Sequence, residues 1–291
     1  MKEVGMSRYD LAVAYRIYPG VSKSPAIVTK DKLELAEICL RSFKLSLGTL
    51  RVKLWALLDG CPPEYERLFL RYFRKQDVVP VRLAGVGNAG SFTEQLRILC
   101  DQQECDLVYL AEDDYFYLEN QFLTLIEFLR AHDDADFVSP YDHPDYYSLD
   151  LHRGSSRVKA FGGKHWRTVN STCLTFLTRK ETLQHTRNVF ETFARRNYDA
   201  SIWLSLTKSV VFNPEAAVRF FATNMLLFKI LAKAWLFGWR QILFGRRWKI
   251  WIPLPSIATH MEESSLAPIH DWPGLFSRAR GKGRTSSRHR R

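Results

Sequence analysis

Short apolar runs that alternate with amphipathic segments are the feature that most constrains the fold of this chain. Four apolar runs predict buried strands, at residues 11–17, 52–58, 78–83 and 106–111. Four segments with helical periodicity alternate with them, at residues 30–47, 63–75, 91–100 and 120–131. Strands joined by helices of this length form right-handed crossovers and a largely parallel sheet. The first half is therefore predicted to be α/β, and its third helix is expected to begin at a capping box of Ser91 and Glu94.

The pattern loosens in the second half of the chain. Residues 140–170 are rich in His, Tyr, Gly and Asp and are predicted to form a functional loop region. Regular structure is expected to return as a strand at 173–178 and as helices at 180–195 and 199–208. The last segment, 278–291, combines Gly, Ser and Arg, a composition typical of a disordered tail.

The net charge of +11 is concentrated in two segments that contain no acid. Residues 219–249 and 278–291 each hold seven Lys or Arg, and the rest of the chain has 28 bases against 31 acids. A protein that coats nucleic acid with a globally basic surface is therefore not expected.

Cysteine usage and hydropathy predict a cytoplasmic protein. The five cysteines form neither a CxxC pair nor a zinc-ligand spacing, so we expect reduced thiols. The first ten residues lack the apolar core of a secretory signal. No run reaches the ~18 apolar residues that a transmembrane span needs.

Three consecutive carboxylates, Glu112, Asp113 and Asp114, follow the predicted strand at 106–111. Ligands of open α/β sheets bind outside the carboxyl ends of the strands. Adjacent carboxylates repel one another unless a cation or hydrogen-bond donors compensate, and oxygen ligands suit Mg²⁺ or Mn²⁺ bound with a substrate's phosphates. We interpret this cluster as a metal site; the alternative is a solvated acidic turn that caps the next helix.

Four weaker features lie elsewhere in the chain. Asp59 ends a predicted strand, where it either accepts from a base or sugar or forms an ordinary Asp-Gly turn. The small residues of 85–90 lead into a helix N-terminus, which favours phosphate. Asp199 begins a predicted helix, where an N-cap is the simpler role. His260 precedes two glutamates and is either a metal ligand or a structural hydrogen-bonding residue.

Taken in order, these five features resemble the inverting family-two nucleotide-sugar glycosyltransferases of the GT-A fold. The resemblance covers about residues 9–268 and is anchored at short motifs. It implies a single GT-A-like α/β domain, with a mostly parallel, Rossmann-like central sheet flanked by helices and a C-terminal helical and basic extension. Two departures are that the DXD element begins with Glu112 and that the base motif reads Tyr198-Asp199 instead of Glu-Asp.

The resemblance also implies a role for each motif residue. The donor-binding residues that it implies are Asp59 at the nucleotide base, Asn88 and Gly90 near the ribose and diphosphate, and Asp113 within the acidic element. The ligands of Mn²⁺ or Mg²⁺ that it implies are Glu112, Asp114 and His260. Asp199 would be the catalytic base that takes the acceptor hydroxyl's proton during an inverting displacement.

The aromatic and polar segment 143–168 suits a sugar-binding wall or a mobile lid, and a purely structural loop is the alternative. Its candidates for contact with the acceptor or with phosphate are Arg153, His165, Trp166 and Arg167.

The basic and aromatic segment 225–251 fits an interfacial amphipathic helix on an anionic membrane surface, with a core helix as the alternative. The tryptophans expected at headgroup depth are Trp235, Trp239, Trp248 and Trp251. On the membrane interpretation the protein is peripheral on the inner face, and the acceptor is a lipid-linked sugar or growing glycan.

The expected organisation has three parts. Residues 1–218 form the nucleotide-sugar-binding and catalytic region, and 219–275 contain the amphipathic segment and the late metal-ligand loop, packed on the same domain. Residues 276–291 form the disordered basic tail. Two other functions compete with the glycosyltransferase. One is a metal-dependent nucleotidyl or phosphoryl transferase, and the other is a non-enzymatic, basic nucleic-acid-binding protein.

Overall fold

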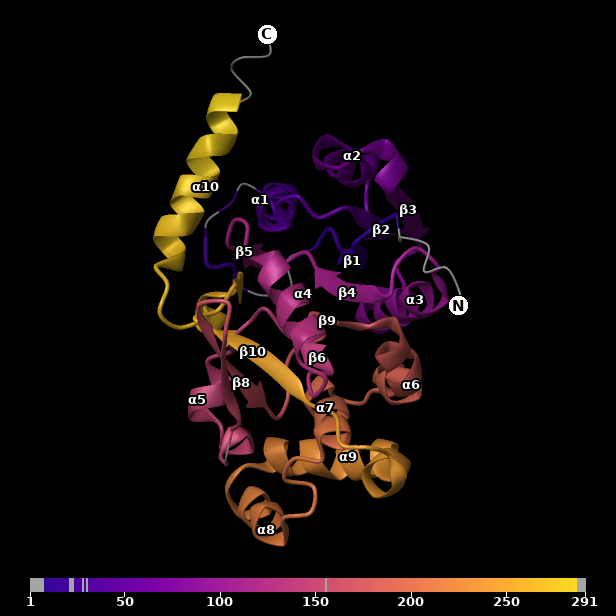
Figure 1. The fold of residues 1–291 in the computed structure, drawn as a ribbon, viewed down its shortest axis with the longest axis vertical. Coiled ribbons are helices and arrows are strands. Elements are labelled where there is room, and N and C mark those ends of the chain that lie inside the picture. Colours follow the sequence, from indigo (N-terminus) through magenta and orange to yellow (C-terminus); the bar gives the residue numbers. More distant parts are fainter. Residues whose placement is uncertain (1–7, 21–23, 28, 30, 155, 287–291) are drawn as a thin grey trace.

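A nine-stranded sheet runs through the molecule in the order β3-β2-β1-β4-β9-β6-β10-β8-β7, and a two-stranded sheet pairs β11 with β5. This computed structural model describes residues 8–20, 24–27, 29, 31–154 and 156–286 (Figure 1). The strands of the large sheet are β1 (Leu11–Ile17), β2 (Val52–Asp59), β3 (Val78–Leu83), β4 (Leu107–Glu112), β6 (Phe137–Val138), β7 (Val158–Phe161), β8 (Lys164–Val169), β9 (Phe176–Arg179) and β10 (Ile250–Leu254). Those of the small sheet are β5 (Tyr115–Tyr117) and β11 (Ala258–His260).

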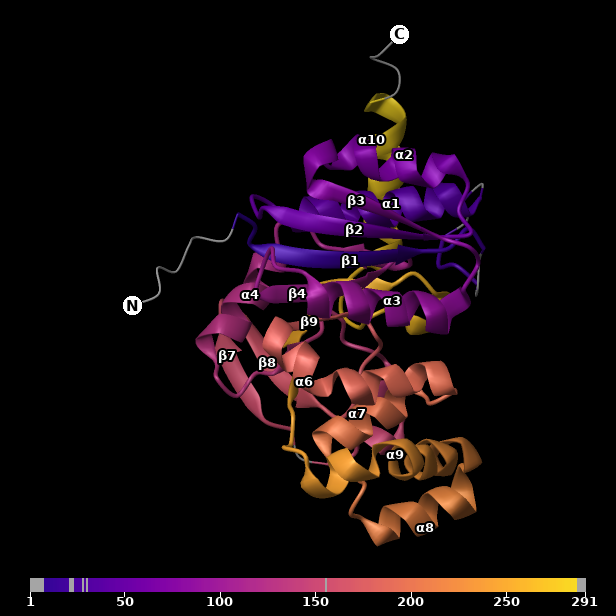
Figure 2. The same cartoon turned by 90° about the vertical axis from the view of Figure 1, so that its right-hand side faces the viewer.

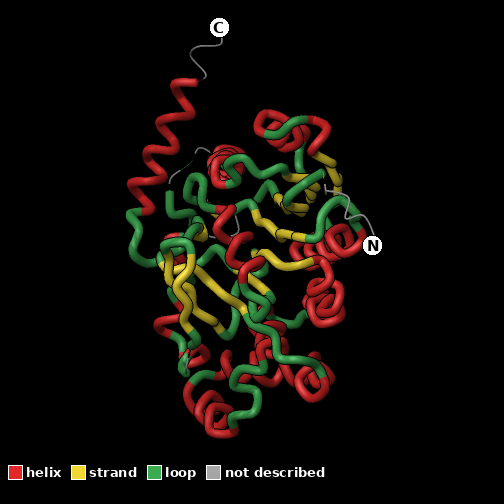
Figure 3. Tube along the Cα trace, in the orientation of Figure 1, coloured by secondary structure: helices red, strands yellow, loops and turns green. Residues whose placement is uncertain are grey.

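Helices flank the sheet on both faces (Figures 1 and 3). They are α1 (Lys32–Ser46), α2 (Pro63–Tyr72), α3 (Gly87–Asp101), α4 (Phe122–Ala131), α5 (Asp145–Ser148), α6 (Lys180–Phe190), α7 (Asp199–Thr207), α8 (Pro214–Thr223), α9 (Met225–Phe244) and α10 (Trp272–Ser286). Short 3₁₀ turns occupy Lys75–Asp77, Asp150–His152, Glu191–Arg195 and Glu263–Ser265.

The predicted α/β fold with a mostly parallel central sheet is confirmed. The pairs β3–β2, β2–β1 and β1–β4 are parallel, and seven of the nine strands run in one direction, with only β9 and β8 reversed. Because β1, β2 and β4 are parallel neighbours, their carboxyl ends meet at one edge of the sheet. Figure 2 shows these strands stacked between the helices.

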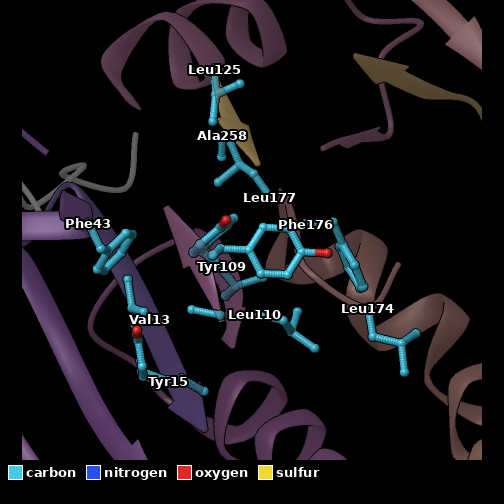
Figure 4. Packing of buried hydrophobic residues seen from close by; sticks show 14 of the residues in the cluster. Val13, Tyr15, Phe43, Tyr109, Leu110, Leu125, Leu174, Phe176, Leu177 and Ala258 are labelled. Carbon is cyan, nitrogen blue, oxygen red and sulfur yellow. The ribbon is translucent and has the colours of Figure 1, made fainter. Parts of the chain in front are cut away.

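Aromatic side chains fill the core between the parallel strands and α1 (Figure 4). Phe43 of α1 stacks on Tyr109 of β4, with ring centroids 5.8 Å apart, and Phe122 of α4 meets the edge of Tyr109 at 4.8 Å. The hydroxyls of Tyr109 and Tyr117 lie 2.8 Å apart, so this buried polar pair satisfies itself. The core therefore ties the small sheet to β4, directly beside the acidic cluster.

The third helix begins earlier than predicted, and the capping box of Ser91 and Glu94 is wrong. The Asp59 carboxylate, at the end of β2, accepts hydrogen bonds from the amides of Val86 (2.7 Å) and Gly87 (2.8 Å). These amides stand at the start of α3, so the helix is capped by Asp59, a residue distant in the sequence. Ser91 lies inside the helix, where its hydroxyl donates to the Asn88 carbonyl.

The predicted loop region 140–170 contains the hairpin β7–β8, which extends the large sheet beside β10. Gly162 and Gly163 have φ of 57° and 72°, so they supply the left-handed residues of its turn. Trp166 of β8 is fully buried and stacks on Phe128 of α4 with centroids 3.9 Å apart. Its predicted role in acceptor contact is therefore wrong, and Trp166 is a core residue.

The basic aromatic segment 225–251, predicted to be one amphipathic helix, forms a helix followed by a buried strand. Residues 225–244 form α9, but Trp251 lies in β10 at 0% exposure and Trp248 is buried beside it, so neither tryptophan reaches a membrane surface. Trp235 is half-buried and donates to the Val211 carbonyl, and Trp239 is the most exposed of the four. Within the described residues, none of the helices has both the length and the apolar character to cross a bilayer.

The segment expected to form a disordered tail, 276–291, overlaps α10, which extends as far as Ser286. Its first turns are anchored by Trp272 and Phe276, whose rings pack on Phe116 of β5 at 6.4 and 5.0 Å. Residues 287–291 lie outside the described part of the chain.

We expect Trp166→Ala to lower the free energy of unfolding by about 3–5 kcal/mol, because it empties a fully buried aromatic site. The matched control is His165→Ala, one residue earlier on β8 and exposed, which should change it by less than about 0.5 kcal/mol. Urea denaturation of both variants measures the difference, and equal effects would contradict this placement of Trp166.

Candidate functional site

The acidic cluster at the end of β4 lies at the sheet edge where β1 and β2 also end. Glu112 sits opposite Arg16 of β1 in the parallel register, and the two side chains form a short ion pair. Thr175, just before β9, donates to the second Glu112 oxygen at 2.6 Å. Both carboxylate oxygens of Glu112 are therefore engaged by neighbouring strands.

Arg16 also binds the start of α3. Its guanidinium donates to the Asn88 carbonyl at 3.0 Å and to the Asn88 side-chain oxygen. Since Arg16 is only 7% exposed, its charge is fixed between Glu112 and the first turn of α3. This residue links the acidic cluster to the small-residue loop that the sequence pointed to for phosphate.

Asp113 points away from Glu112 and has its own cation. Lys32, the first residue of α1, lies 3.0 Å from the Asp113 carboxylate, and the Tyr18 amide donates to it at 3.2 Å. Burial raises the pKa of Asp113 to about 6, the negative charge of Asp114 adds to this, and Lys32 counteracts it. Asp113 thus anchors the chain after β1 to the start of α1.

Asp114 lies beside His260, and the resemblance implied that both are metal ligands. The antiparallel pairing of β11 with β5 sets His260 opposite Tyr115, and His260 Nε2 lies 3.1 Å from an Asp114 oxygen. Burial opposes ionisation of Asp114, but the hydrogen bond and charge of His260, with Lys32 and Arg16, hold its pKa below its usual range. The other oxygen, Oδ1, is buried and has no hydrogen-bond partner among the described residues.

Asp114 and His260 fit a divalent cation better than the full predicted ligand set does. Two ligands at right angles on an octahedral ion with ~2.1 Å bonds lie about 3 Å apart, close to the observed 3.1 Å. The unpartnered Asp114 Oδ1 offers a further acceptor. Within the described part of the chain, no three His, Cys, Asp or Glu side chains form a metal-sized cluster, and Glu112 is taken up by Arg16 and Thr175.

Asp199 approaches the acidic cluster from a different part of the chain. Partial burial raises the pKa of the Cys173 thiol, and the negative charges of Asp199, Glu112 and Asp114 contribute to the increase. All three carboxylates therefore lie within electrostatic reach of one sulfur. Asp199 is the first residue of α7, after the cap position, and its carboxylate accepts from the Ala200 amide at 2.7 Å. Asp199 is therefore not the N-cap of α7.

The remaining donor candidates lie on the open side of the same edge. Asn88 is exposed and Gly90 half-exposed at the start of α3. Gly85 and Gly87 have φ of 73°, and a Cβ at either would meet nothing within 4 Å, so the loop borders open space. Asp59, in contrast, is 2% exposed and serves as the cap of α3.

The acceptor candidates from 143–168 separate into three environments. Arg153 is largely exposed and pairs with Asp150 at 2.8 Å, and His165 is exposed on β8. Arg167 is the one that lines a pocket, together with Tyr146 and His152. Its guanidinium pairs with the buried Asp142 at 3.1 Å and lies over the Tyr147 ring at 4.5 Å. Its Nε is buried without a hydrogen-bond partner among the described residues.

Three residues that contact the acidic cluster were not predicted from the sequence. Arg16 lies within an apolar run, which indicates only a strand, and Lys32 lies at the polar start of a predicted helix. Thr175 lies in a run predicted as strand. The one available signal was the carboxylate cluster itself, because adjacent buried carboxylates require cations, but the sequence does not say which cations arrive.

Comparisons with known proteins give a likeness in fold only. No protein-family model matches the sequence, and no curated protein matches it. The solved galactosyltransferase LgtC, in complex with donor and acceptor sugar analogs, is 12% identical, with 93% of this chain and 95% of that chain covered and a TM-score of 0.49. A CMP:2-keto-3-deoxy-manno-octonic acid synthetase complexed with CTP is 12% identical, with 95% and 99% covered and a TM-score of 0.38. At this level of similarity neither protein assigns a role to any residue here.

The ion pair of Arg16 with Glu112 should contribute more to the free energy of unfolding than a surface ion pair does. We expect Arg16→Met to lower the free energy of unfolding by about 3 kcal/mol, because it leaves a partly buried carboxylate without its cation. Arg71→Met, which breaks the more exposed pair with Glu37, is the control and should cost less than about 1 kcal/mol. Equal costs in urea denaturation would contradict the structural role of Arg16.

The pocket histidine should make stability depend on pH. Burial, with the charges of His143 and Arg167, lowers the pKa of His152 to about 4. The unfolded chain therefore binds more protons, so stability falls as the pH drops from about 6.5 toward 4. We expect His152→Gln to reduce this loss by at most ~1.4 kcal/mol per pH unit, whereas His165→Gln should not alter it. Urea midpoints measured across this range test it, and an unchanged slope in His152→Gln would contradict the assignment.

Proposed function

We propose that this protein is a glycosyltransferase that moves a sugar from a nucleotide-diphosphate donor to a glycan or lipid-linked acceptor, with inversion at the anomeric carbon. The observation that most supports this function is the 3.1 Å approach of His260 to Asp114, at the sheet edge where Arg16 also contacts Asn88 in the first turn of α3. The pair would supply a cation site beside a helix N-terminus, and Asp199 would be the separate carboxylate that acts as a base.

The donor would lie across the carboxyl ends of β1, β2 and β4. Asn88 and Gly90 stand in the first turn of α3, where the helix dipole favours a diphosphate, although the Asp59 carboxylate already holds the amides of Val86 and Gly87. Arg16 adds a fixed positive charge directly beside Asn88. Asp59 remains the candidate for contact with the nucleotide base, and Asp113 remains a candidate donor contact within the acidic element, although both carboxylates already hold backbone amides.

A divalent cation, Mn²⁺ or Mg²⁺, would be held by Asp114 and His260, and when bound it offsets negative charge on the leaving diphosphate. Glu112, the third ligand implied by the resemblance, would act instead through Arg16, by holding that guanidinium beside α3. Positive charge near the leaving group would thus come from both the cation and the chain's own arginine.

Asp199 would act on the acceptor. Its carboxylate would take the proton of the acceptor hydroxyl while that oxygen forms the new bond to the anomeric carbon. The bond from this carbon to the diphosphate breaks on the opposite side, and the nucleotide leaves with the electron pair. Arg167, Arg153 and His165 are the candidates for positioning the acceptor, with Arg167 the only one that lines the pocket.

We expect one nucleoside diphosphate from a panel of UDP, GDP, TDP, CDP and ADP to bind in calorimetry, more tightly with Mn²⁺ than without. Asp114→Ala should abolish the gain from Mn²⁺, because it removes the carboxylate next to His260. Asp133→Ala, an exposed acid, is the control and should bind like the wild type. If no nucleotide binds under either condition, the proposed function is wrong.

Asp199→Asn should keep nucleotide and metal binding but lower sugar transfer by roughly 10²–10⁴-fold, since only the proton acceptor is lost. Glu181→Gln, at the first turn of α6 and exposed, is a matched control and should transfer normally. Product formation is followed by release of the nucleoside diphosphate that the panel identifies. Normal turnover in Asp199→Asn would remove Asp199 as the base, and loss of binding would assign it to the donor site.

A further inference from the structure

Exposed apolar side chains are concentrated on α8, α9 and the short segment that precedes α8. Of the eighteen exposed large hydrophobic residues in the described chain, nine lie between 212 and 244. They are Phe212, Val218, Phe221, Met225, Leu226, Leu236, Trp239, Leu243 and Phe244. We call this set the α8–α9 surface. Exposed apolar residues gathered in this way indicate a partner, whereas single ones do not.

These side chains are exposed because α9 uses its other face to pack on the domain. Leu227, Ile230, Leu231, Ala234, Gly238 and Ile242 are buried, at helical spacing. The Ser201 and Ser205 hydroxyls of α7 donate to carbonyls of α9, and Gly238 sits so close to Ser205 that a Cβ would lie 2.2 Å from its oxygen. The exposed residues therefore form the outer face of a well-anchored helix, with Leu236 at 69% and Phe244 at 80% exposure.

Basic side chains stand among these apolar residues without acidic partners. Lys229 and Arg240 are exposed on α9, Arg247 is exposed just after it, and none of the three forms an ion pair with a described carboxylate. Arg240 lies over the ring of Trp239 at 5.3 Å. Residues 219–249 contain no acid at all. The partner should therefore be both apolar and negatively charged.

The α8–α9 surface occupies one end of the molecule. In both views α8 and α9 lie at the end opposite α10 (Figures 1 and 2). α10 therefore does not adjoin α9. The contact surface is confined to α8 and α9.

We propose that the α8–α9 surface docks the protein on the face of an anionic lipid bilayer, with α9 lying in the interface. Phosphate headgroups match Lys229, Arg240 and Arg247, which form no ion pair with a described carboxylate, although Arg247 donates to the Thr207 carbonyl at 2.8 Å. The acyl boundary matches Leu236, Leu243 and Phe244. Nucleic acid matches only the charges and would leave these apolar side chains in water. The helix is docked along its side, in keeping with the absence of a spanning helix among the described residues.

Docking there would place the proposed base close to the membrane, an extension that rests on the proposed function. Asp199 begins α7, the helix on which α9 packs. An acceptor hydroxyl carried on a lipid anchor would then reach Asp199 from the side of the bilayer. The surface itself stands on exposure and charge and does not depend on that activity.

The test is co-sedimentation of the full chain with vesicles of phosphatidylcholine alone or mixed with phosphatidylglycerol, at low and high salt. We expect binding to the mixed vesicles that weakens with salt. Lys229→Gln with Arg240→Gln should weaken it roughly 30-fold, since each basic residue near an anionic surface contributes about fivefold. Leu236→Ser with Leu243→Ser and Phe244→Ser should weaken it at least as much.

The matched control is the triple variant Leu45→Ser, Leu70→Ser and Leu123→Ser, which removes exposed leucines from α1, α2 and α4 and should bind like the wild type. Nucleotide binding, measured separately, reports the proposed function and should be unchanged in every variant. Failure of the wild type to bind the mixed vesicles overturns the proposal. So does unchanged binding by the apolar triple variant, or a dimer that this variant dissociates. Salt-dependent RNA binding that this variant retains would assign the basic residues to nucleic acid instead.

Discussion

The arrangement depends on neutralising three adjacent carboxylates at the end of one buried strand. Ionised Glu112, Asp113 and Asp114 repel one another in a low-dielectric environment unless cations or hydrogen-bond partners compensate. The fold supplies a different partner for each: Arg16 from β1 pairs with Glu112, Lys32 from α1 pairs with Asp113, and His260 from β11 lies within hydrogen-bond distance of Asp114. The alternation of side chains around the turn after β4 lets the three partners approach from different sides.

Each of these contacts also fixes a segment that borders the candidate donor site. Arg16 connects Glu112 to the first turn of α3, and Asp59 caps that same helix, so the small-residue loop is held from two strand ends. The pairing of β11 with β5 brings His260 to Asp114, 146 residues earlier in the chain. The interactions that compensate the three carboxylates therefore also hold the segments around the site in place, and loss of one partner would disturb both.

The sequence predicted those parts that depend on local periodicity. The strands β1 to β4 and their helices follow from apolar runs. The order of motifs named Asp114 and His260 as candidates for one site, and the structure has them 3.1 Å apart. The hairpin β7–β8 was missed because its exposed residues alternate with few buried ones, and Trp251 was misread because basic residues precede its strand. Arg16 and the capping by Asp59 join residues distant in the sequence, so no local pattern specifies them.

On the proposed function, the end of β4 and the start of α7 form one site for a nucleotide sugar. The decisive experiment is a crystal structure with Mn²⁺ and the nucleoside diphosphate that binds, with the ion located by its anomalous scattering. We expect a manganese peak in contact with Asp114 and His260, with the diphosphate between it and the first turn of α3. A nucleotide bound elsewhere, or manganese bound away from both residues, would contradict it.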